Sequence, residues 1–207
     1  MNKLEILKEL ESLDIVEEFF HCALWLSKYI KDFKNDKALE KAYGIWEKNM
    51  ALRHWIRKNT LKPQYQLWIG KNVRASEDMP PKDSQVVFTK EKDAYTWSSS
   101  KRYAVSCTQT DNDKIKGSYL LKVFTSKDEV IFDLYSLSRL QFTDEELTQL
   151  VEAGFSQRTA SLLKDTLEEL SKDSFKEIII CTDVVNRGQV SAVLPKGGNI
   201  DGNWRFR

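Results

Sequence analysis

The chain has 207 residues, of which 41% are hydrophobic and 30% are charged, and its formal net charge is +1. This balance excludes an intrinsically disordered chain, because enough apolar surface is present for one substantial core with a helical appendage. A net charge near zero gives no global field that attracts nucleic acid or an anionic membrane. Such a partner would need a local patch.

The number and spacing of the cysteines and histidines predict neither disulfide bonds nor a metal site. Cys22, Cys107 and Cys181 are widely spaced and odd in number, which predicts small buried apolar residues. His21 and His54 have no carboxylate or cysteine at a metal-ligand spacing, so we expect no metal site. The start of the chain lacks the continuous apolar stretch of a signal peptide, and no segment reaches the length of a membrane span. We therefore expect a soluble, cytoplasmic protein with no membrane partner.

The first part of the chain has helical periodicity. Apolar residues recur three or four positions apart over residues 4–34, with Asp14 as a candidate cap at a break, and again over residues 36–58. The second period ends where Asn59, Thr60 and Pro63 interrupt it. Residues 1–62 are therefore predicted to form an N-terminal helical region.

After residue 62 the pattern changes to short β-prone segments, at 65–69, 84–89, 118–125 and 129–134. Thr143 and Glu146 have the spacing of a helix capping box, and a second helix over 158–172 follows a turn at Gly154. Residues 176–185 give the strongest signal for a buried strand, with 189–194 as its neighbour. Helices first and strands later predict an α+β fold, and no Gly-rich phosphate loop opens a helix.

Several short segments carry a family resemblance. They read YQLWIG at 65–70, AYTWSSSKRYA at 94–104, GSYLLKVF at 117–124, VIFDLYSL at 130–137 and EIII at 177–180. In order and residue type they resemble the strands and motifs of the ADP-ribosyltransferase superfamily, over roughly residues 65–194. The resemblance implies a core at 63–207 of two small packed β-sheets with flanking helices, which hold NAD in a cleft.

The same resemblance implies roles for individual residues. Glu177 would be the catalytic carboxylate that stabilises positive charge on the ribose, and Ser98 would orient it. NAD, the substrate that supplies ADP-ribose, would be bound by a further set of residues. These are Trp68, Gly70, Lys71, Thr96 and Tyr103, with Tyr95 as a second candidate for packing on the nicotinamide ring.

The sequence departs from the family pattern at two positions. Ile69 stands where the first strand of the family has an arginine, so Lys71, with Arg74 beyond it, is expected to supply the cation for the pyrophosphate. Phe175 stands where many members have a second Glu or Gln, which argues against arginine as the acceptor. The small size and helical start are similar in layout to phage-encoded and toxin-type members.

The resulting hypothesis is a mono-ADP-ribosyltransferase that modifies a protein. One alternative keeps the chemistry but has RNA or DNA as the acceptor, held by a basic cluster around Trp55 whose other interpretation is a solvated face. A second alternative is a non-catalytic interaction or inhibitor protein on the same fold. Taken singly, Glu177 fits a solvated strand end, and the three serines 98–100 fit a turn or a helix N-cap. The basic cluster consists of Lys48, Arg53, Arg57, Lys58 and Lys62, with His54.

Overall fold

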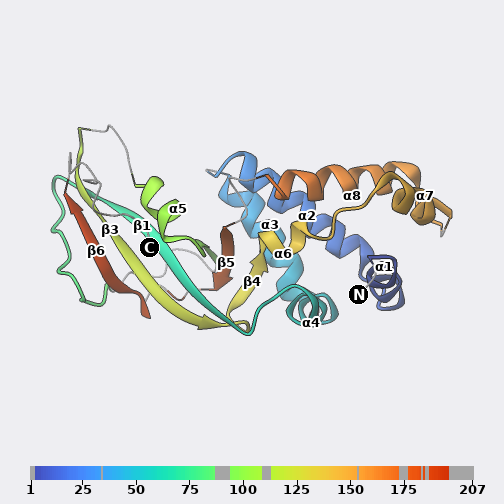
Figure 1. The fold of residues 1–207 in the computed structure, drawn as a ribbon, viewed down its shortest axis with the longest axis horizontal. Coiled ribbons are helices and arrows are strands. Elements are labelled where there is room, and N and C mark those ends of the chain that lie inside the picture. Colours follow the sequence, from blue (N-terminus) through green and yellow to red (C-terminus); the bar gives the residue numbers. More distant parts are fainter. Residues whose placement is uncertain are drawn as a thin grey trace.

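A computed structural model describes residues 3–33, 35–86, 94–108, 113–152, 154–172, 177–182, 184 and 187–195. The molecule has a mixed α+β architecture, as expected, with most helices gathered at one end and the sheet extending to the other (Figure 1). Within these residues, no helix is both long and apolar enough to cross a membrane.

Four helices precede the sheet: α1 (Lys3–Ser12), α2 (Val16–Lys31), α3 (Asp36–Lys48) and α4 (Met50–Asn59). The predicted stretch 36–58 is thus two helices, because the Asn49 side chain accepts the N–H of Leu52 at 2.9 Å and caps a new helix. The predicted break near residue 14 is present. Asp14 does not cap α2, however, since Ile15 occupies the N-cap position and Asp14 has a φ of 54°.

The strands form one antiparallel sheet of six strands in the order β4-β5-β2-β1-β3-β6. This corrects the expectation of two packed sheets. The strands are β1 (Gln64–Arg74), β2 (Ala94–Ser98), β3 (Ile115–Ser126), β4 (Val130–Asp133), β5 (Ile178–Thr182) and β6 (Gln189–Pro195).

Two three-stranded halves can nevertheless be distinguished within the sheet. We call β1, β3 and β6 the long half, and β4, β5 and β2 the short half. The halves are joined where β1 meets β2, and within the described part of these strands one register pair, Trp68 with Ser98, connects them. By contrast, β1 and β3 pair along their whole length. Of the expected strand 84–89, Gln85 forms an isolated bridge with Gln189, and residues 87–89 lie outside the described residues.

The later helices are α5 (Lys101–Ser106), α6 (Leu134–Ser138), α7 (Asp144–Glu152) and α8 (Gln157–Leu170). The predicted capping box before α7 is confirmed, because Thr143 and Glu146 each accept the other's backbone N–H, at 3.2 and 2.8 Å. Gly154 has a φ of +107° after α7, which confirms the predicted turn.

One large apolar core holds the helical end together. It contains residues of α1–α4 together with α6–α8, and the inward side chains of β4 and β5, such as Phe132 and Ile180, complete it. The N-terminal helices therefore share their core with the later helices and the short half. A second core lies against the opposite face of the sheet and includes Leu67, Trp97 and Ile179. Both faces of the short half are thus buried.

Candidate functional site

A cavity of about 150 Å³ opens where the two halves of the sheet meet. Its walls come from β1, β2 and α5, from the first residue of β5, and from the segment that follows α2. Of the residues that the sequence selected as site candidates, the cavity is lined by Trp68, Gly70, Thr96, Ser98 and Tyr103. Four separate stretches of the chain are brought together here, at residues 33, 68–70, 96–107 and 178.

Strand alternation explains this grouping. Trp68 pairs with Ser98, and Ser98 pairs with Ile178, so all three side chains lie on the same face of the sheet. Lys71 is an odd number of residues from Trp68 and points to the other face, and it is not among the residues that line the cavity. Tyr95 likewise packs into the core on that opposite face. The structure therefore does not bring Lys71 or Tyr95 to this cavity.

Gly70 has a packing reason of its own. A side chain there would overlap the Thr108 methyl group and the Ala104 carbonyl oxygen, at the end of α5. The absence of a Cβ lets α5 lie directly against β1, and that contact closes one side of the cavity. Trp68 packs beside it, against Ala104 and Leu120.

The three serines at the end of β2, Ser98 to Ser100, fix the local backbone. Ser98 is buried, and its hydroxyl accepts the N–H of Ser100 at 2.9 Å. Ser99 donates its N–H to the Glu177 carbonyl oxygen at 2.8 Å. Ser100 caps α5 by accepting the Tyr103 N–H at 3.3 Å, so the N-cap interpretation of this segment is confirmed. Glu177 is thereby held beside the end of β2.

Two residues with titratable side chains, Tyr103 and Cys107, line the cavity, and Glu177 directly precedes the lining residue Ile178. Burial raises the pKa of Tyr103 to about 12, with further contributions from Cys107 and from the negative charge of Glu177. Cys107 lines the cavity one helical turn after Tyr103, and partial burial of its thiol raises the pKa. The residue as a whole is exposed, so the expectation of a buried cysteine is wrong at this position. Near neutral pH both groups are protonated and act as hydrogen-bond donors. The Glu177 carboxylate is close enough to Tyr103 for its negative charge to act on the Tyr103 hydroxyl.

The N-terminal helices contribute residues that the sequence analysis missed. The Tyr29 hydroxyl forms a 2.7 Å hydrogen bond with the Thr96 hydroxyl, although 67 positions separate them in the chain. Phe33 lines the cavity and makes an edge-on ring contact with Tyr29 at 5.4 Å. The only sequence signal was the pair of aromatic residues four apart at the end of a helix. Cys107 and Ile178 are further lining residues.

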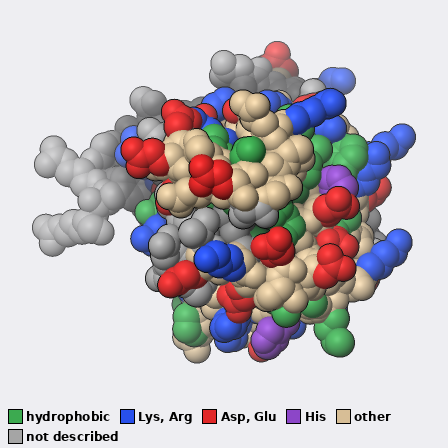
Figure 2. Space-filling view, turned by 90° about the vertical axis from the view of Figure 1, so that its right-hand side faces the viewer, with side chains coloured by type: hydrophobic (Ala, Val, Ile, Leu, Met, Phe, Trp, Pro, Cys, Tyr) green, Lys and Arg blue, Asp and Glu red, His purple; other side chains and the backbone are tan. Residues whose placement is uncertain are grey.

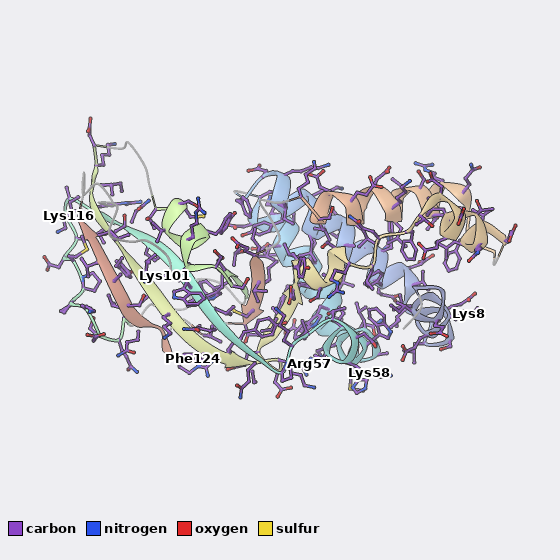
Figure 3. All side chains as sticks on the ribbon, viewed as in Figure 1. Lys8, Arg57, Lys58, Lys101, Lys116 and Phe124 are labelled. Atoms are coloured by element: carbon purple, nitrogen blue, oxygen red, sulfur yellow. The ribbon has the colours of Figure 1, made fainter. Side chains whose placement is uncertain are left out.

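The basic cluster lies away from this cavity, on and around α4; Figure 3 labels Arg57 and Lys58 there, and Lys101 near α5. Some of its charges have internal partners. Lys58 pairs with Glu9 at 2.9 Å, and Arg57 donates to the Asp128 carbonyl oxygen at 2.6 Å. Arg53 stacks over Trp46 at 5.4 Å. On the helical end seen in Figure 2, basic and acidic side chains are interspersed, so this face has no patch of one sign.

The described residues contain no group of His, Cys, Asp and Glu that could hold a metal ion. They also place no Lys or Arg in the cavity wall. Comparisons with protein-family models, curated proteins and solved structures give no match for this chain.

Proposed function

We propose that this protein is a mono-ADP-ribosyltransferase, which cleaves the bond between nicotinamide and ribose in NAD and transfers ADP-ribose to a macromolecular acceptor. One observation carries the proposal. Residues selected from separate motifs, on β1, β2 and α5, line a single cavity. Glu177 does not line it, but it directly precedes the lining residue Ile178, and its backbone carbonyl accepts the Ser99 N–H. A chance set of polar and aromatic residues, spread along the chain, has no reason to converge in this way.

The size of the cavity restricts what enters it. Pockets that enclose whole drug-sized ligands measure roughly 300–1,000 Å³. At about 150 Å³ this cavity suits a single aromatic ring, such as nicotinamide. Trp68, Tyr103 and Phe33 offer aromatic surfaces against which the ring would pack. The pyrophosphate would lie outside, where Lys101 and Arg102, in the first turn of α5 just before the lining residue Tyr103, are candidate cations.

The reaction requires stabilisation of a cation. When the bond from the ribose C1′ to nicotinamide breaks, its electron pair leaves with nicotinamide and positive charge develops on the ribose. The Glu177 carboxylate would stabilise this charge, while Ser98 and Thr96 hold the ribose hydroxyls. The acceptor then forms a new bond to C1′ and loses its proton to solvent.

Nicotinamide release from NAD, measured with cell lysate present, tests the proposal. The variant Glu177→Gln should lose about 100- to 1,000-fold in rate, because one stabilising group of the transition state is removed. Its NAD affinity, followed by tryptophan fluorescence from Trp68, should stay close to that of the wild type. Glu152→Gln makes the same chemical change at an exposed position on α7 and should have full activity.

The outcomes separate the alternatives. Full turnover by Glu177→Gln would remove this residue from the mechanism. A wild-type protein that neither binds NAD nor releases nicotinamide would instead be a non-catalytic interaction protein. Treating the lysate with nuclease or protease, and locating labelled ADP-ribose afterwards, distinguishes a nucleic-acid acceptor from a protein acceptor.

A further inference from the structure

A second, larger hollow of about 580 Å³ lies at the end of the long half, where β1 and β3 extend beyond β6. We call it the rim groove. Its walls include Gln64, Gln66 and Ser126, and also Phe124, whose side chain is 66% exposed. A single exposed hydrophobic residue is common on protein surfaces, so Phe124 supports a binding role only together with the groove that it lines and the cations around it.

The exposed ring has a cation against it. The Lys122 ammonium group lies 4.7 Å from the centre of the Phe124 ring. Lys122 pairs with Trp68, and Phe124 pairs with Gln66, so all four side chains are on the face that also carries the cavity. Trp68 and Gln66 are two residues apart, about 7 Å along the strand. The rim groove therefore begins next to the mouth of the cavity.

Further cations surround the rim groove. Arg187 lies in its wall and pairs with Glu129 at 2.6 Å. The Lys127 N–H donates to the Pro63 carbonyl oxygen at 3.2 Å, which places Lys127 beside Lys62.

Arg57 extends this edge toward α4 through its bond to Asp128, and Figure 3 shows Phe124 and Arg57 along the same rim of the molecule. The groove wall itself has one cation and one carboxylate, Arg187 and Glu129, so the additional positive charge comes from Lys122, Lys127 and Arg57 around it.

We propose that the rim groove binds single-stranded nucleic acid. A base would stack on Phe124, the amides of Gln64 and Gln66 would face base edges, and Lys122 and Lys127 would contact phosphates. An acidic protein segment would use the cations, but it would leave the exposed ring and the two amides without a function. The inference is independent of ADP-ribosyl transfer, because binding can be measured without NAD.

Fluorescence anisotropy with labelled oligouridine and oligothymidine of about 12 nucleotides tests the proposal, since one binding surface of this kind covers ~4–16 nucleotides. Phe124→Ala should weaken binding about tenfold or more, through loss of one stacked base. Tyr135→Ala is the matched control, because Tyr135 is also exposed, at 40%, and has Arg139 at 6.0 Å, but does not line the groove. It should bind like the wild type.

Salt dependence gives a second readout. Lys122→Gln should reduce the slope of log affinity against log salt by about 0.7, the value for one phosphate contact with a single strand. Lys116→Gln, on the same strand but at the far end of the sheet (Figure 3), should leave the slope unchanged.

Three results would each overturn the proposal. These are no binding of either oligonucleotide, equal binding by Phe124→Ala and wild type, and displacement of the oligonucleotide by polyglutamate as readily as by unlabelled oligonucleotide. The last result would identify the rim groove as a site for acidic proteins.

Discussion

The two halves of the sheet differ in how they are supported. Both faces of the short half are buried, one by the helical core and the other by the second apolar core. The long half extends past the helices, and one of its faces carries exposed side chains such as Phe124. The cavity lies at the junction of the halves, where pairing between strands is reduced to Trp68 and Ser98.

This difference indicates that the two halves have different roles. Burial of both faces makes the short half a rigid base, which holds Ser98 and the start of β5 in place. A surface that binds a partner must be accessible, so we expect it on the part of the sheet that the helices do not cover. At the junction, the buried strands of the short half lie next to the exposed face of the long half.

Substituting phenylalanine in each half tests the difference in burial directly and should give the largest effect. Phe132 on β4 is 1% exposed and lies in the helical core, so Phe132→Ala should cost about 3–5 kcal/mol in free energy of unfolding. Phe124→Ala should change it by about 0.5 kcal/mol or less, as is usual for a surface position. Urea denaturation measures both.

A milder variant, Phe132→Leu, keeps the comparison measurable if the alanine variant does not fold, because it removes less volume. Equal destabilisation by Phe124→Ala and Phe132→Ala would show that the long half is as deeply involved in the core as the short half. The division between the halves would then be wrong.

A glycine pair tests the junction itself. In Gly70→Ala the new methyl group would overlap the end of α5, and the strain should cost about 1–3 kcal/mol. Because α5 forms a wall of the cavity, ligand binding should weaken too. Gly44→Ala in α3 makes the same change with no atom within 4 Å, and it should stabilise the protein by about 0.5–1 kcal/mol. If Gly70→Ala is neutral in both stability and binding, α5 does not need close contact with β1.

The sequence predicted elements better than it predicted their contacts. Local signals identified every strand except β2, and also the capping box and the turn at Gly154, because spacing and capping chemistry are properties of neighbouring residues. The strand β2 was expected only from the family resemblance. The cap at Asn49 was missed, since the apolar period continues on both sides of it.

Long-range contacts were harder to foresee. Lys71 was chosen because it shares a strand face with Ile69, but the register with Ser98 puts the cavity on the other face. The bond from Tyr29 to Thr96 joins segments that only the folded chain brings together. Likewise, the two expected sheets are one, because a single register pair connects them. Those features depend on tertiary packing, which the pattern of residues adjacent in sequence does not predict.

Alkaline pH should lower the free energy of unfolding by a smaller amount, through tyrosines on the long half and at its junction with the short half. Two tyrosines, Tyr103 and Tyr119 on β3, each have a pKa raised to about 12, and burial is the main cause in both cases. In an unfolded chain the ordinary value is near 10. The folded protein therefore holds these phenol protons more tightly, and their contribution to stability is complete below about pH 10 and is lost as the pH rises through 12.

Urea denaturation at intervals between pH 9 and 12 should accordingly show a free energy of unfolding that falls with pH. Tyr103→Phe removes one of the titrating groups, so the fall should be shallower in this variant, while Tyr119 retains part of it. An identical slope in the variant and the wild type would mean that the Tyr103 hydroxyl is solvated in solution. The wall of the cavity at α5 would then be open, and the nicotinamide ring would lose the enclosed surface on which its binding is proposed to depend.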